Sequence, residues 1–91
     1  MLKISRKVEY ALIALRHLQG LKKEELASAK ELANAYGVPK ELLAKVLQRL
    51  AKKNIIDAVK GPHGGYRLAI DPERMRLTEF FEIIEGPMLS L

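Results

Sequence analysis

The chain has 91 residues, of which 48% are apolar and 30% are charged, with a formal net charge of +5 at pH 7. This length fits one small domain, residues 1–91, and excludes a two-domain enzyme. A domain this short buries only about 60% of its unfolded surface, so we expect self-association to help it. The sequence contains no cysteine, which excludes disulfides, thiolate catalysis and cysteine-ligated zinc or iron–sulfur sites in these residues, and we expect no metal and no cofactor.

The sequence shows no membrane or export signal. No apolar run approaches the roughly 18 residues that a spanning helix needs. The first nine residues are charged and lack the apolar core of a signal peptide. We therefore expect a cytoplasmic protein with no membrane contact.

The positive charge is concentrated in the middle of the chain. Residues 38–67 hold seven basic and two acidic side chains, whereas residues 68–91 hold two basic and five acidic ones. A basic middle beside an acidic end favours a polyanionic partner, and an ordinary solvated surface is the alternative.

Ser5 precedes a run of good helix formers, which predicts a first helix over residues 6–19, ended by Gly20. Projected on a helix, the run has two apolar faces. The first holds Val8, Ala11, Leu12, Leu15 and Leu18, and the second holds Tyr10, Ile13, Ala14 and His17. We expect the second face to contact another subunit, since so small a domain offers little core; burial of both faces within the chain is the alternative.

A helix-turn-helix is predicted over about residues 28–53. Ser28 and Glu31 have the spacing of a capping box that starts a second helix, and Gly37 suits the left-handed residue that ends it. Pro39 fits the first position of a third helix, which is strongly amphipathic. Because this helix follows the turn, we interpret it as the recognition helix of a DNA-binding module.

Two β-rich runs, residues 55–59 and 66–70, flank a segment rich in glycine and proline and predict a hairpin. The glycines do not form a nucleotide-binding loop, because a strand and not a helix follows them. A hairpin after a recognition helix is typical of a wing, here about residues 55–70. Thr78 is expected to cap a last short helix that Gly86 stops.

The predicted fold is therefore mainly α with a small β-hairpin, a winged helix-turn-helix. An enzyme is not expected, because the only histidines are His17 and His63, and Ser5 and Ser28 are explained as helix caps.

The segments 4–12, 29–33, 43–50, 61–68 and 77–86 together resemble the Rrf2 family of bacterial transcription regulators. The most specific of them is Gly61-Pro-His-Gly-Gly-Tyr-Arg-Leu68. The resemblance covers residues 2–87 and implies a winged helix-turn-helix homodimer that binds a double-stranded DNA operator. In that family the sensing cysteines and a long dimerisation helix normally follow the corner at Gly86, so we expect no cluster sensing and only a weak dimer from these 91 residues.

We expect DNA contacts from both parts of the motif. The candidates are Ser28, Pro39, Lys40, Glu41, Ala44, Lys45 and Arg49 in the helix-turn-helix and Lys60, His63, Gly64, Gly65 and Arg67 in the wing. The cations suit phosphates or guanine, and Glu41 suits a cytosine amino group; many family members have an acidic residue at Ala44, so operator preference is expected to differ here. Gly64 and Gly65 are expected to need positive φ and to let the backbone approach the duplex.

The dimer is expected to form through the second face of the first helix, Tyr10, Ile13, Ala14 and His17, with the apolar residues Met88, Leu89 and Leu91 added. The alternative function is a protein-interaction module that docks through the same face without specific DNA binding. Salt dependence discriminates the two, because each phosphate contact contributes a slope of roughly −0.9 to DNA affinity.

Overall fold

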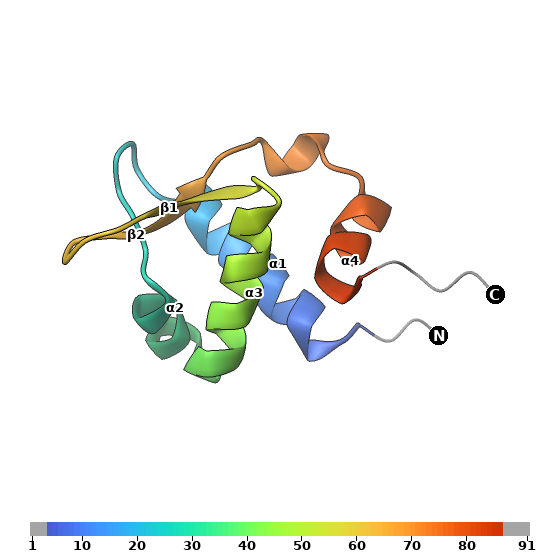
Figure 1. Cartoon of the computed structure of the whole chain (residues 1–91), viewed down its shortest axis with the longest axis horizontal. Helices are drawn as coiled ribbons and strands as arrows, with labels where there is room; N and C mark the ends of the chain where they lie inside the picture. The colour runs from blue at the N-terminus through green and yellow to red at the C-terminus, as the bar shows by residue number, and fades with distance from the viewer. Residues whose placement is uncertain (1–3, 87–91) are drawn as a thin grey trace.

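The computed structural model describes residues 4–86 and shows a helical body from which one hairpin projects (Figure 1). The order of elements is α1 (Arg6–Gln19), α2 (Ala29–Tyr36), α3 (Lys40–Lys52), β1 (Ile56–Val59), β2 (Gly65–Leu68), the 3-10 turn η1 (Pro72–Arg74) and α4 (Leu77–Glu85). The prediction of a mainly α fold with a small hairpin is confirmed. No helix in the described range is long and apolar enough to cross a membrane.

Most helix ends follow from local chemistry, as predicted. The Ser5 hydroxyl accepts a hydrogen bond from the Val8 N–H at the start of α1. Ser28 and Glu31 form both bonds of the capping box, at 2.9 and 3.1 Å. Gly37 has φ 64 in the turn between α2 and α3. These caps supply partners for backbone groups that a helix end leaves unpaired.

Two predicted helix starts differ by a residue or two. Pro39 is the cap of α3, and the helix itself begins at Lys40. Thr78 does not cap α4, because that helix begins at Leu77, where the Glu79 carboxylate accepts the Arg76 backbone N–H at 3.1 Å. The acidic side chain three residues into the helix, and not the threonine hydroxyl, satisfies the helix start.

The core lies where α1 crosses behind α3 and contacts α3, α4 and β2 (Figure 1). Its largest fully buried side chains are Leu32, Leu43, Leu47, Leu50, Ile55 and Ile56. Removing such side chains from water is the main stabilising contribution in a small domain.

The expected subunit face of α1 is largely part of this core, which corrects the prediction. Tyr10 and Ala14 are only 4% and 0% exposed, so the chain itself covers them. Ile13 is half-buried against the same core. The reason is that α1 packs between other elements on both sides, whereas Leu12, assigned to the buried face, is 39% exposed. The other expected contact residues, Met88, Leu89 and Leu91, lie outside the described residues.

His17, the fourth residue expected on that face, has a partner within the chain. Its Nδ1 lies 2.8 Å from the Tyr36 hydroxyl, and the two rings meet edge to face with centroids 5.5 Å apart. The contact joins the last turn of α1 to the last residue of α2, and it holds the first helix of the helix-turn-helix on the core.

The wing is a two-stranded antiparallel sheet in which Asp57 lies opposite Arg67. A third stretch, which the sequence did not predict, pairs with it. Ala27 donates to the Tyr66 carbonyl at 3.1 Å, and Tyr66 donates to the Ala27 carbonyl at 2.8 Å. Because Ala27 directly precedes the cap of α2, this bridge fixes the wing relative to the helix-turn-helix.

Candidate nucleic-acid interface

Helix α3 presents its polar side chains to solvent directly after the α2–α3 turn. Leu43, Val46, Leu47 and Leu50 are buried on its inner side. Lys40, Glu41, Lys45, Gln48 and Lys52 are exposed on its outer side, and Ala44 is half-buried beside them. The predicted cations Lys40 and Lys45 and the predicted reader Glu41 therefore share one accessible surface with the exposed cap residue Pro39. This surface suits contact with a polyanion.

Arg49 behaves differently from the other predicted contacts. It is exposed, but its Nε donates a 2.6 Å hydrogen bond to the Ile83 carbonyl of α4. The guanidinium is thereby turned toward α4, away from Lys40 and Glu41 at the first turn of α3. The structure gives this side chain an intramolecular partner that the sequence reasoning missed.

The wing carries the other predicted cations near its tip. Lys60 and His63 are exposed. Arg67 lies in strand β2. Its Nε is 3.8 Å from the Oδ2 of Asp57 in the neighbouring strand β1, and both side chains are 53% exposed. An ion pair this long and exposed is weak, so Arg67 remains able to exchange its carboxylate for another anion.

The two wing glycines serve the protein's own packing, which corrects the sequence interpretation. Neither Gly64 nor Gly65 has positive φ, whereas Gly61 does, at 116°. A Cβ on Gly64 would stand 2.0 Å from the Val59 carbonyl oxygen, and one on Gly65 would stand 2.9 Å from the backbone of Ala27. Both positions therefore require glycine because backbone approaches backbone inside the wing.

The wing tip lies beside the start of α2. Ser28, His63 and Gly64 line one open hollow of about 350 Å³ together with the carboxylates of Glu24 and Glu31. The Ser28 backbone N–H and hydroxyl lower the pKa of Glu31, which keeps this carboxylate charged. Two acidic groups make the hollow itself a poor phosphate site, so a phosphate would have to approach its outer rim.

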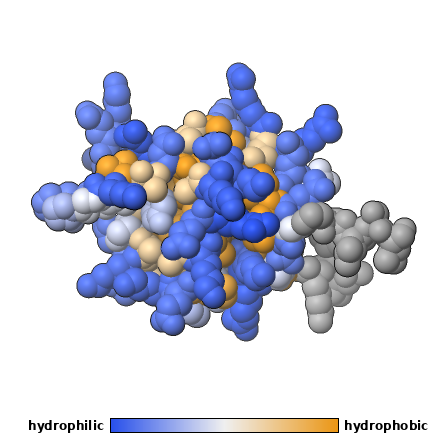
Figure 2. Space-filling view, viewed as in Figure 1, coloured by the Kyte–Doolittle hydropathy of each residue, from blue (hydrophilic) through white to orange (hydrophobic). Residues whose placement is uncertain are grey.

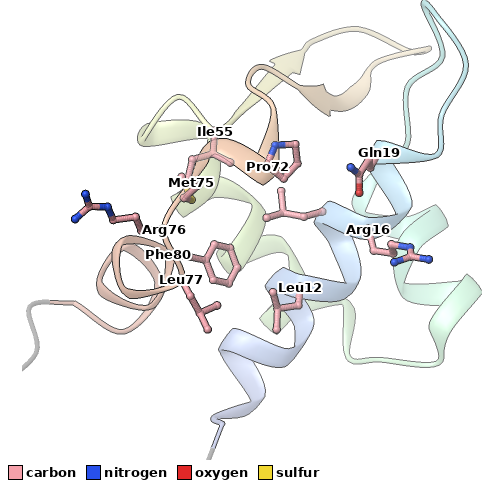
Figure 3. A pocket seen from close by; sticks show the side chains of 10 residues that line it. Leu12, Arg16, Gln19, Ile55, Pro72, Met75, Arg76, Leu77 and Phe80 are labelled. Atoms are coloured by element: carbon pink, nitrogen blue, oxygen red, sulfur yellow. The ribbon is translucent and has the colours of Figure 1, made fainter.

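Hydrophilic side chains cover most of the face seen in Figure 2, with smaller apolar areas between them. An apolar groove of about 410 Å³ lies between α1, η1 and α4 (Figure 3). Leu12 and Leu77 lie on opposite walls of the groove and are 39% and 59% exposed, respectively. The groove is separate from the outer side of α3 and from strands β1 and β2.

The comparisons with known proteins agree with this geometry. The model of the Rrf2 family, described as iron-dependent transcriptional regulators, matches residues 4–91. The chain is 34% identical to the transcriptional regulator IscR of Cereibacter sphaeroides over 86 residues, which span 92% of this chain and 56% of that protein. It is 32% identical to NsrR of Bacillus subtilis over 78 residues, 86% of this chain and 53% of that protein.

Among solved structures, the global cysteine regulator CymR of B. subtilis is similar to the chain with a TM-score of 0.85 at 26% identity, covering 100% of this chain and 70% of that one. The IscR structure of T. potens gives a TM-score of 0.79 at 29% identity, covering 99% of this chain and 65% of that one. The chain thus spans little more than half the length of the two relatives compared by sequence.

The donor set of these residues does not fit an iron site. The sequence contains no cysteine. Within residues 4–86, no three histidine, aspartate or glutamate side chains gather as metal ligands. We assign no iron-dependent step to this part of the chain.

Proposed function

Because the chain belongs to the Rrf2 family of transcriptional regulators, we propose that it binds double-stranded DNA as a sequence-specific regulator of transcription. The observation that carries this proposal is the exposed, mostly basic outer side of α3 directly after the helix-turn-helix turn. The family description and the names of the matched relatives are those of transcription regulators and not of enzymes.

In the proposed complex, α3 lies in the major groove with its first turn toward the base edges. Glu41 accepts a hydrogen bond from a cytosine amino group, and Lys40 donates to guanine or to a phosphate. Lys45, one turn farther along, neutralises a phosphate. Pro39 and the half-buried Ala44 shape the contact surface. Ser28, at the start of α2, approaches the DNA backbone.

In the same proposed complex, the wing contacts the DNA backbone through Lys60, His63 and Arg67. Its reach toward DNA is supported by the Ala27–Tyr66 bridge, which attaches β2 to the segment that enters α2. Arg49 is left out of the contact set, because the bond from its Nε to the Ile83 carbonyl turns the guanidinium toward α4.

We also propose that the operator-bound form is a homodimer in the cytoplasm, where bacterial operators lie. Half-sites one helical turn apart are separated by roughly 34–36 Å, and a two-fold operator needs two recognition helices. One copy of the chain supplies one such helix, within a body of 45 × 26 × 20 Å. The α1 face chosen for the protein-interaction module is largely buried and does not favour that alternative.

Selection of bound sequences from random DNA tests the proposal. The wild type should enrich one motif with two-fold symmetry, and its affinity should fall steeply with salt, by roughly −0.9 in log–log slope for each phosphate contact. Glu41→Ala should relax the preference at one position in each half-site. A wild type that enriches no motif and binds with a shallow salt slope would contradict the proposed function.

A further inference from the structure

Arg49 joins the last turn of the recognition helix to the last turn of α4. Its Nε and the Ile83 carbonyl oxygen are 2.6 Å apart, although the residues are separated by 34 positions in the sequence. The bond is charge-assisted, which makes it stronger than a bond between neutral groups.

The Ile83 carbonyl cannot accept the usual hydrogen bond from its own helix. In an α-helix a carbonyl accepts the N–H four residues on, which here belongs to residue 87, a proline without an N–H. Gly86, at φ 89, donates its own N–H to Glu82 at 2.8 Å and turns the chain out of the helix. Arg49 supplies the missing donor, and its positive charge also suits the negative end of a helix dipole.

The same region is where α3 and α4 pack together. One hollow between the two helices is lined by Lys7 of α1, by Leu42, Lys45, Val46 and Arg49 of α3, and by Ile84 and Glu85 of α4. Ile84 is 5% exposed. The buried Ile84 packs at this contact, and the Arg49–Ile83 bond beside it ties the last turn of α3 to the last turn of α4. A shift of the last turn of α4 would therefore turn the outer side of α3.

We propose that Arg49 is a positioning residue, which holds α3 in its DNA-binding orientation by capping α4 and does not itself touch DNA. This inference rests on the proposed function.

Three substitutions separate positioning from a phosphate contact. Arg49→Gln keeps a donor nitrogen on Cδ, the place that Nε holds in arginine, and removes the charge. Arg49→Met matches the glutamine side chain in length and removes both donor and charge, and Arg49→Lys keeps the charge but has a methylene in place of Nε. Each protein is titrated with operator DNA over a range of salt concentrations.

Positioning predicts that Arg49→Gln stays within about threefold of the wild type, and that Arg49→Met loses about tenfold, the factor expected for one hydrogen bond to a charged group. The salt slope of both variants should equal that of the wild type. A phosphate contact would instead give equal losses in the Gln and Met proteins, a retained affinity in the Lys protein, and a salt slope smaller by about 0.9 in the Gln and Met proteins. That outcome would overturn the proposal.

A measurement without DNA distinguishes a failure of the Arg49 positioning role from a failure of the proposed DNA-binding function. In nuclear magnetic resonance spectra of the free protein, Arg49→Met should move the Ile83 carbonyl carbon and the amides of residues 40–45, and Arg49→Gln should leave both close to the wild type. Unchanged amides in the Met protein would overturn the positioning role even if DNA binding is intact. A wild type that does not bind DNA while these shifts occur would refute the proposed function and leave the α3–α4 link established.

Discussion

Gly65 lies directly against the backbone of Ala27: a Cβ at this glycine would stand 2.9 Å from the Ala27 carbonyl oxygen. The contact is this close because the next residue, Tyr66, exchanges two backbone hydrogen bonds with Ala27. Strand β2 is drawn onto the segment that precedes α2, and no side chain fits between them. The glycine is therefore a requirement of the wing's attachment to the helix-turn-helix.

We expect Gly65→Ala to destabilise the protein by about 1–3 kcal/mol, as overpacking does in well-packed sites, since the atoms it meets belong to backbone and cannot swing away. DNA affinity should fall with it because the wing loses its fixed position. Urea denaturation and an operator titration measure the two effects. Gly20→Ala is the control, because its Cβ would meet nothing closer than 3.5 Å. Reduced affinity at an unchanged urea midpoint would assign Gly65 to the DNA surface.

Lys45→Ala should weaken binding to every DNA sequence, because its ammonium group is expected to neutralise a phosphate. The salt slope should shrink by about 0.9, the share of one contact. Stability should change by less than about 0.5 kcal/mol, since Lys45 is exposed on α3. Arg74→Ala is the matched control, an exposed cation in η1 away from α3. Equal effects of the two substitutions would reduce the role of Lys45 to general charge.

The capping box gives stability an acid-sensitive component. Hydrogen bonds from Ser28, the backbone N–H first, lower the pKa of Glu31 below its ordinary value of 4.5. A carboxylate with a lowered folded-state pKa stabilises the fold above its ordinary pKa, and this stabilisation is lost as the pH falls through the folded-state value. The free energy of unfolding of the wild type should thus exceed that of the Glu31→Gln protein by a constant amount near neutral pH.

Below about pH 4.5 this difference should shrink as the wild-type carboxylate becomes protonated. Chemical denaturation at a series of pH values measures it. Glu73→Gln serves as the control, because within residues 4–86 its carboxylate accepts no hydrogen bond and only its backbone N–H is bonded, to Asp71. A gap between the wild type and Glu31→Gln that is independent of pH would show that the Glu31 charge contributes nothing to the cap.

The sequence predicted the features that depend on neighbouring residues. Ser5, Ser28 and Gly37 mark helix ends through bonds that span only a few positions, and amphipathic spacing predicted which side of α3 faces water. Contacts between distant segments carried no local signal, so the bridge from Ala27 to Tyr66 was missed. The bond from Arg49 to Ile83 had one available clue, the proline four residues after Ile83, but its donor could not be identified without the packing of α3 on α4.

The proposed homodimer needs a surface that the predicted face of α1 cannot supply, because Tyr10 and Ala14 are buried. Leu12 and Leu77 are instead exposed together on the walls of the groove between α1 and α4 (Figure 3). An exposed apolar groove is a surface suited to being covered. We expect a second copy to cover them, with an area below about 1,200 Å² and hence a weak association.

Sedimentation equilibrium of Leu12→Glu and Leu77→Glu tests this expectation, together with binding to a two-fold operator. Both substitutions should reduce self-association and cooperative binding and leave the unfolding midpoint nearly unchanged, because a charge at an exposed position costs little in the monomer. Ile70→Glu is the matched control, since Ile70 is also 39% exposed and does not line the groove. If the wild type associates and the groove variants associate equally well, the dimer forms through another surface; if Ile70→Glu alone disrupts it, that surface includes the end of the wing.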